Sequence, residues 1–169
     1  MSRYDLVPRK LFFTSGVGRH PDSLASFEMA LRDSKIEHLN LVAVSSIVPP
    51  GCSIVPKAEG LAELRPGEIT FVVLSRISSS DSGRLISASV GCAIPGDESD
   101  NDRFGYLAEH HTFDKSKDET RKFACDLARE MYTTLSCNSD IDIRTCGIAA
   151  DAASGYGCTT VVCAAVFLL

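Results

Sequence analysis

The sequence predicts an α+β fold, a sandwich built mostly from antiparallel strands. Two segments have helical periodicity, whereas about seven short segments have the composition or alternation of strands. The strand segments are not separated by regular helices, which argues against a doubly wound parallel sheet. With 169 residues, of which 44% are hydrophobic, the chain is long enough for a single domain, residues 1–169, with a sizeable core.

The N-terminal region is expected to contain a strand followed by a helix. Residues 11–14 form the strand-like segment, and Gly16 and Gly18 after it predict a loop, because glycine usually interrupts regular structure. A helix is expected to begin at Asp22 or Ser23, which are both good N-cap residues. Helical spacing predicts that its apolar face consists of Leu24, Phe27 and Leu31.

A second, short strand is expected at residues 39–44. It leads into Ser45 and Ser46, and it must end before Pro49 and Pro50, because proline cannot donate to a sheet ladder. Five later segments also have strand character, with an acidic loop after the second of them at residues 95–103. These strands are expected at residues 69–76, 85–94, 104–113, 143–150 and 159–169.

A long helix is expected to begin at Ser116. Ser116 and Glu119 have the spacing of a capping box, in which the serine hydroxyl accepts from the backbone N–H of the glutamate and the carboxylate reaches back. The buried stripe of this helix is predicted to consist of Phe123, Leu127 and Met131.

Charge and hydropathy narrow the classes of partner. The net charge is −5, and no run of like charges resembles a nucleic-acid-binding tail, so no nucleic acid is expected. Charges near the N-terminus leave no apolar region for a secretory signal. The most apolar segment, residues 161–169, is far shorter than the roughly 20 residues of a membrane helix. We therefore expect a buried strand there and no membrane partner.

The cysteines predict neither a zinc site nor a disulfide framework. There are seven, an odd number, and none forms a C-x-x-C pair. They read as scattered small core residues in a reducing compartment, which predicts a cytoplasmic protein without a metal site.

The segment with the most chemical information is N-L-V-A-V-S-S-I-V-P-P, residues 40–50. On composition alone, two adjacent serines before a double proline indicate a polar strand end and a rigid turn. The segment also resembles the self-cleavage site of the pyruvoyl-dependent arginine decarboxylases, in which a short strand that begins at an asparagine leads to Ser-Ser-Ile-x-Pro-Pro. Other blocks resemble this family in the same order, at residues 24–31, 86–97, 105–109, 157–158 and 164–165.

The resemblance implies that the chain makes its own cofactor. The hydroxyl of Ser46 would attack the carbonyl of Ser45, and the chain would be cut into residues 1–45 and 46–169, with a pyruvoyl group at position 46. This group would act as the electron sink that pyridoxal phosphate provides elsewhere. The implied reaction converts arginine to agmatine and CO2. The implied fold is a four-layer αββα sandwich. The implied assembly is a trimer of cleaved protomers, with active sites between subunits and, in some members, two stacked trimers.

Three further residues match family site positions. Glu109 matches the glutamate that protonates the carbon after loss of CO2, a role that requires a raised pKa, typically through burial. The alternative is an ordinary exposed strand glutamate. Asn40 matches the active-site asparagine; its even spacing from Ser46 would put both side chains on one face of a regular strand, where its amide could stabilise the acyl shift. The alternative is an asparagine that bonds local backbone.

Glu28 matches the position where the family usually has an aspartate that binds the guanidinium group. A carboxylate can bind that group through two hydrogen bonds, but the glutamate is one methylene longer. The alternative is a surface ion pair with Arg32, four residues on in the helix. The longer side chain motivates a rival function, a pyruvoyl-dependent decarboxylase of lysine or ornithine. A second rival, independent of Glu28, is an uncleaved, non-catalytic oligomeric homologue.

Overall fold

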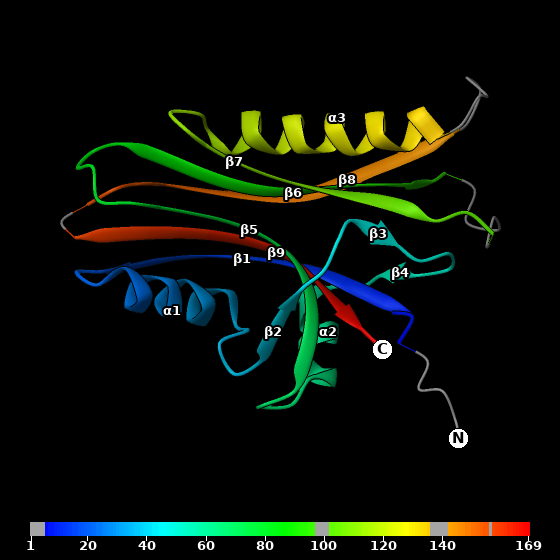
Figure 1. The fold of residues 1–169 in the computed structure, drawn as a ribbon, viewed down its shortest axis with the longest axis horizontal. Helices are drawn as coiled ribbons and strands as arrows, with labels where there is room; N and C mark the ends of the chain where they lie inside the picture. Colours follow the sequence, from blue (N-terminus) through cyan, green and yellow to red (C-terminus); the bar gives the residue numbers. More distant parts are fainter. Residues whose placement is uncertain (1–5, 97–101, 136–141, 156) are drawn as a thin grey trace.

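The chain folds into four layers, with helices outside two packed β-sheets (Figure 1). The computed structural model describes residues 6–96, 102–135, 142–155 and 157–169. A hydrophobic core fills the space between the sheets, and each outer sheet face is covered by helix. The predicted α+β fold, a four-layer αββα sandwich of mostly antiparallel sheets, is confirmed.

The first sheet has the strand order β2-β5-β9-β1-β4. Its central strand, β9, is buried along its whole length and pairs antiparallel with β1 and β5, which confirms the buried C-terminal strand. The short strands β2 and β4 join the two edges in parallel. The bounds are β1 (Lys10–His20), β2 (Asn40–Ala43), β4 (Ser53–Ile54), β5 (Ile69–Ser79) and β9 (Cys158–Leu168).

The second sheet has the order β3-β7-β6-β8 and is antiparallel throughout. The side chains of β6 alternate as predicted, but both of its faces are buried. Val90 faces the core between the sheets, whereas the hydroxyls of Ser87 and Ser89 bond Thr120 on the covering helix. The bounds are β3 (Ile47–Val48), β6 (Leu85–Pro95), β7 (Gly105–Phe113) and β8 (Ile143–Ala153).

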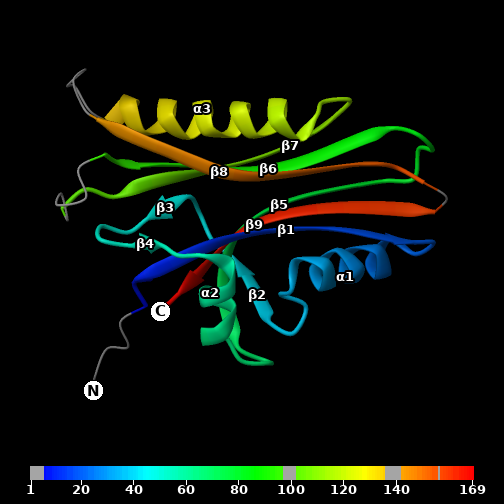
Figure 2. The ribbon, with the colours of Figure 1, turned by 180° about the vertical axis from the view of Figure 1, so that it is seen from behind.

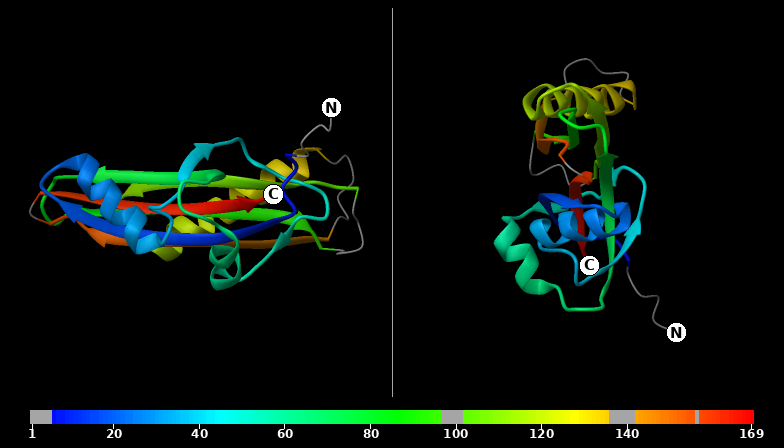
Figure 3. Two further views of the ribbon diagram at one scale, coloured as in Figure 1. Left: turned by 90° about the horizontal axis from the view of Figure 1, so that it is seen from below. Right: turned by 90° about the vertical axis from the view of Figure 1, so that its left-hand side faces the viewer.

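In the part of the chain that the structure describes, three helices are found. They lie on the outside of the sandwich, as Figures 2 and 3 show. The helices α1 (Ser23–Ser34) and α2 (Lys57–Glu63) cover the first sheet, and α3 (Lys117–Leu135) covers the second. Asp22 is the N-cap of α1, as predicted, and its carboxylate accepts from the backbone N–H of Ala25 at 2.9 Å. No helix within the described ranges has both the length and the apolar character needed to cross a membrane.

The prediction of a loop at Gly16 and Gly18 is wrong, because both glycines lie inside β1. A Cβ atom at Gly18 would lie 2.1 Å from the carbonyl oxygen of Ser26, and one at Gly16 would lie 2.2 Å from that of Ala30. The glycines are therefore needed for the close approach of α1 to the strand, not for a turn.

The close approach also explains why the predicted helix faces are partly wrong. In α1, Leu24 is 74% exposed, whereas the buried residues are the small Ser26, Ala30 and Ser34. In α3, Phe123 is 52% exposed, and the wholly buried Ala124 lies over Gly91 of β6. Helices that pack closely on glycines bury small side chains and leave some of their large ones outside.

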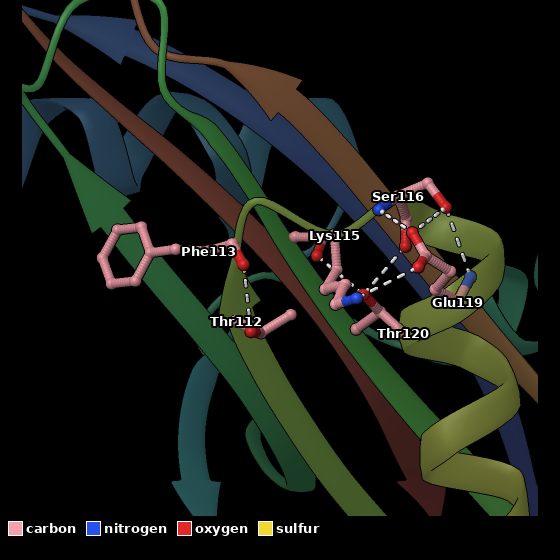
Figure 4. A network of polar contacts seen from close by, with 7 residues as sticks. Thr112, Phe113, Lys115, Ser116, Glu119 and Thr120 are labelled. Carbon is pink, nitrogen blue, oxygen red and sulfur yellow. Dashed lines mark hydrogen bonds and ion pairs between the residues drawn. The ribbon is translucent and has the colours of Figure 1, made fainter.

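The capping box of α3 is confirmed (Figure 4). The backbone N–H of Ser116 donates to Glu119 Oε2 at 3.0 Å, and the N–H of Glu119 donates to Ser116 Oγ at 3.4 Å. Lys115 Nζ adds an ion pair with Glu119 at 3.3 Å. The bonds from Ser116, followed by those from Lys115, lower the pKa of the Glu119 carboxyl.

No sequence pattern predicted α2. This helix is short, begins after Pro56 and contains Gly60, which lowers helix propensity. Gly60 packs on the ring of Phe12, where a Cβ atom would lie 2.1 Å from a ring carbon. Most of the acidic loop predicted at residues 95–103, together with Cys137, lies outside the described residues.

Candidate functional site

The two serines lie where the chain passes from one sheet to the other. β2 belongs to the first sheet and ends at Ala43, and β3 belongs to the second sheet and begins at Ile47. The connection, residues 44–46, is the cyan segment between β2 and β3 in Figure 1. Ser45 is exposed and Ser46 is half-buried. The Ser45–Ser46 peptide is thus outside both sheets and accessible from solvent.

The crossover is attached to a different sheet on each side of this peptide. The backbone N–H of Val44 donates to the carbonyl of Val72 in β5 at 3.0 Å. The backbone N–H of Leu107 in β7 donates to the carbonyl of Ser46 at 2.7 Å. If the Ser45–Ser46 bond were cut, each new end would therefore keep its own attachment to a sheet.

A proline turn fixes the chain beyond the crossover. The backbone N–H of Cys52 donates to the carbonyl of Pro49 at 3.1 Å, and Gly51 has a φ of 70°. Proline at the second position and a glycine with positive φ at the third are typical of a type II turn. The double proline ends β3 and redirects the chain to β4, whereas the strand predicted at residues 39–44 ends earlier, at Ala43.

Glu109 lies on the strand that holds Ser46. It is two residues beyond Leu107, so the two side chains share a face of β7 and their Cα atoms are about 7 Å apart. Leu107 is wholly buried, whereas Glu109 is exposed. A single chain therefore brings Ser46 and Glu109 onto neighbouring segments, but it does not supply the burial that proton donation near neutral pH requires.

Asn40 is engaged at the start of β2. Its side-chain Nδ2–H donates to the carbonyl of Gly67 at 2.8 Å, and its backbone N–H donates to that of Glu68, also at 2.8 Å. The regular strand ends at Ala43, so even spacing does not carry the face of Asn40 through to Ser46. In the single chain, the amide bonds the backbone of a residue 27 positions away in the sequence.

Glu28 belongs to α1, a helix that lies to one side of the crossover between β2 and β3 in Figure 1. Its Oε1 accepts from Arg32 Nε at 3.0 Å in an ion pair whose side chains are 42% and 58% exposed, respectively. One chain therefore does not bring Glu28 to Ser46. Its carboxylate faces solvent on the outer surface of the helix.

Apolar side chains around the crossover are exposed to an unusual degree, and sequence reasoning missed them. They come from β2 and the residue after it, from β3, from the start of β5 and from the residue before β7. We call them the crossover patch: Val42, Val44, Ile47, Ile69 and Phe104, which are between 37% and 63% exposed. Their strand-like pattern resembles that of core residues, so the sequence carried no signal that they would face solvent. Exposed apolar side chains that gather in one region are typical of interfaces.

Comparison with known proteins decides the family. Residues 10–169 match the family described as pyruvoyl-dependent arginine decarboxylase. The chain belongs to this family. A protein of Methanocella arvoryzae with that name is 50% identical over 167 residues, which cover 99% of both chains. A protein of Methanosarcina mazei named pyruvoyl-dependent arginine decarboxylase 1 is 47% identical over 164 residues, which cover 97% of this chain and 98% of that protein. A protein of the same name in Archaeoglobus fulgidus is 49% identical over 164 residues, which cover 97% of this chain and 100% of that protein.

Membership of the pyruvoyl-dependent arginine decarboxylase family gives the crossover its significance. The matched range includes both serines at the crossover and the three other residues singled out in the sequence, namely Asn40, Glu28 and Glu109. The crossover presents an accessible peptide, a half-buried Ser46 and an attachment on either side of the bond.

Proposed function

We propose that this chain cuts itself between Ser45 and Ser46 and then decarboxylates L-arginine to agmatine and CO2. The observation that carries the proposal is the position of this peptide, which bridges the two sheets with an attachment on each side. Family membership supports the cofactor and the substrate class. The odd set of cysteines without C-x-x-C pairs favours a cytoplasmic site of action.

The cleavage needs a β-hydroxyl at position 46. Ser46 Oγ attacks the carbonyl carbon of Ser45 and displaces the amide nitrogen, which gives an ester. Elimination breaks the Cβ–Oγ bond, releases the carboxylate of Ser45 and leaves dehydroalanine at position 46. Water then replaces the nitrogen, ammonia leaves, and a pyruvoyl group remains. The Leu107 N–H holds the Ser46 carbonyl while the adjacent peptide reacts.

The remaining site residues have distinct roles in this proposal. The pyruvoyl group supplies an electron-withdrawing carbonyl that accepts the electron pair left by CO2. Glu109 delivers a proton to the α-carbon of the substrate. Asn40 stabilises the negative oxygen that develops during the acyl shift, for which its amide must leave the carbonyl of Gly67. Glu28 binds the guanidinium group through its two oxygens.

We propose that these residues meet between neighbouring subunits of a homotrimer, or of two stacked trimers. Two observations support an interface here. Glu109 is exposed in the single chain although its role requires burial, and the crossover patch is apolar and open to solvent. A neighbouring subunit that covers the patch would bury Glu109, and it could bring its own Glu28 to the site. The molar mass from light scattering would give the number of subunits.

Glu28 also motivates a second candidate substrate. A carboxylate one methylene longer than aspartate leaves a shorter or differently directed pocket, which would suit lysine or ornithine. Purified, cleaved protein should be assayed with the three amino acids in competition. Preference for arginine supports the first assignment, and equal turnover of ornithine would contradict it.

Intact mass spectrometry of the purified protein tests the proposal first. We expect two fragments, residues 1–45 and a pyruvoyl-blocked 46–169. The Ser46→Ala variant should remain one chain, because it lacks the attacking hydroxyl. Ser45→Ala is the matched control and should still be cleaved, because it retains the carbonyl that is attacked. A folded wild-type chain that stays intact would favour the non-catalytic oligomeric homologue instead.

A further inference from the structure

Two cysteines lie directly opposite one another in the second sheet. Cys92 of β6 and Cys146 of β8 are register partners in an antiparallel pair. Side chains of such partners point to the same face, here toward the core between the sheets. The Cα atoms of directly opposed residues are about 4.5–5.5 Å apart, which lies within the range of about 4.4–6.8 Å that disulfides span. A bond between these sulfurs would therefore not require the strands to move apart.

The two thiols differ in accessibility and acidity. Cys92 is wholly buried, whereas Cys146 on the edge strand is half-buried. The interaction with the Cys92 thiol lowers the pKa of Cys146 against the opposing effect of burial, and Arg144 lowers it further. The interaction with Cys146, followed by burial, raises the pKa of Cys92. Cys146 is thus the better nucleophile, and Cys92 is placed to react with it next.

The neighbouring cysteines are less suitable. Burial raises the pKa of Cys52 to about 11, so its thiolate is scarce. Cys125 belongs to α3, which covers the other face of the sheet. Its Sγ lies over Gly147 on that face, where an added Cβ atom would be 3.0 Å from it. Cys163 is wholly buried, and burial raises its pKa to about 12.

We propose that Cys92 and Cys146 form a reversible oxidation site for peroxides. The Cys146 thiolate attacks one oxygen of hydrogen peroxide and the O–O bond breaks. The attacked oxygen stays on the sulfur as a sulfenic acid, and the other oxygen leaves as hydroxide. The Cys92 thiol then attacks this sulfur, and its proton leaves with the sulfenic oxygen as water. The product is a cross-strand disulfide, and thiol reductants restore both cysteines.

The site is independent of the proposed decarboxylase activity. Both cysteines lie in residues 46–169, so a disulfide between them would form equally in a cleaved or an uncleaved chain. Its position is nevertheless close to the crossover. Cys92 is the register partner of Leu107, whose N–H holds Ser46, so one row across the second sheet runs from Cys146 through Cys92 and Leu107 to Ser46.

The test counts free thiols before and after peroxide. The full-length protein is treated with hydrogen peroxide, unfolded and alkylated, and its intact mass is then measured by mass spectrometry. The reduced chain should carry seven alkyl groups, and the oxidised chain should carry two fewer, with full recovery after dithiothreitol. Peptide mapping should place the disulfide between Cys92 and Cys146. Unchanged alkylation, or a disulfide that joins any other pair, would overturn the proposal.

Variants separate the two roles. Cys146→Ser should abolish the loss of two thiols, whereas the matched variant Cys52→Ser should retain it. In Cys92→Ala the disulfide cannot form, so a sulfenic acid should accumulate at Cys146 and be trapped by dimedone. Because Cys92 is wholly buried, its variant could fail to fold; Cys146→Ser, at a half-buried edge position, then decides the question alone. A disulfide that persists in Cys146→Ser contradicts the proposal.

Discussion

The backbone N–H of Leu107 donates to the carbonyl oxygen of Ser46 at 2.7 Å, and this bond connects the crossover to the strand that carries Glu109. It joins residues that are far apart in the sequence. It also places Ser46, the proposed cofactor position, beside Leu107, which precedes the proposed proton donor Glu109 by two residues on β7. Because the donor is a backbone group, no side-chain motif could have indicated it.

Replacement of Glu109 separates self-cleavage from turnover. We expect Glu109→Gln to be cut at the crossover as the wild type is, but to lose about 10²–10⁴-fold in decarboxylation rate, the usual contribution of a positioned proton donor. Intact mass and CO2 release measure the two steps. Glu130→Gln, an exposed change on α3, is the control and should retain the rate. Full activity of Glu109→Gln would rule out the proton-donor role.

Replacement of Glu28 tests the guanidinium site. Loss of a charged hydrogen-bond acceptor in Glu28→Gln should raise KM for arginine by about 10- to 100-fold. Arg32→Ala is the control, because it removes the ion pair of Glu28 within α1 and keeps the carboxylate. If the surface ion pair were the main role of Glu28, both variants would show the same small change in stability and neither would change KM.

The fit between α1 and β1 predicts a large cost for a single methyl group. In Gly18→Ala, the new Cβ would meet the carbonyl oxygen of Ser26 at 2.1 Å, so the helix must shift. We expect the free energy of unfolding to fall by about 1–3 kcal/mol. Gly155→Ala is the matched control, because its Cβ would have no neighbour within 4 Å. Urea denaturation of both variants measures the difference, and equal stability would contradict the close packing.

The capping box of α3 should make stability depend on pH. Hydrogen bonds from Ser116, and then from Lys115, lower the pKa of Glu119 below its ordinary value of 4.5. A lowered pKa in the folded state stabilises the protein above the ordinary value, and this contribution is lost as the pH falls through the lowered one. Glu119→Gln should therefore lower Tm at pH 7, and its difference from wild type should shrink below pH 4.5. A constant difference would exclude the carboxylate as its cause.

Local patterns predicted much of the fold. The capping box at Ser116 and the N-cap at Asp22 were correct because they depend on residues a few positions apart. The strand at residues 85–94 was also found, although its burial on both faces depends on α3. Predictions at Gly18 and Leu24 were wrong for a common reason: α1 lies so close to β1 that the strand needs glycine and the helix buries small residues.

The sequence by itself determined the family, the position of the adjacent serines and the proline turn that follows them. These features are short linear patterns, which can be recognised without knowledge of distant contacts. Only the tertiary structure decided that the Ser45–Ser46 peptide bridges two sheets, that Leu107 holds one side of it, and that the crossover patch faces solvent. Which strand neighbours which, and which apolar side chains remain uncovered, depends on long-range packing that local patterns do not encode.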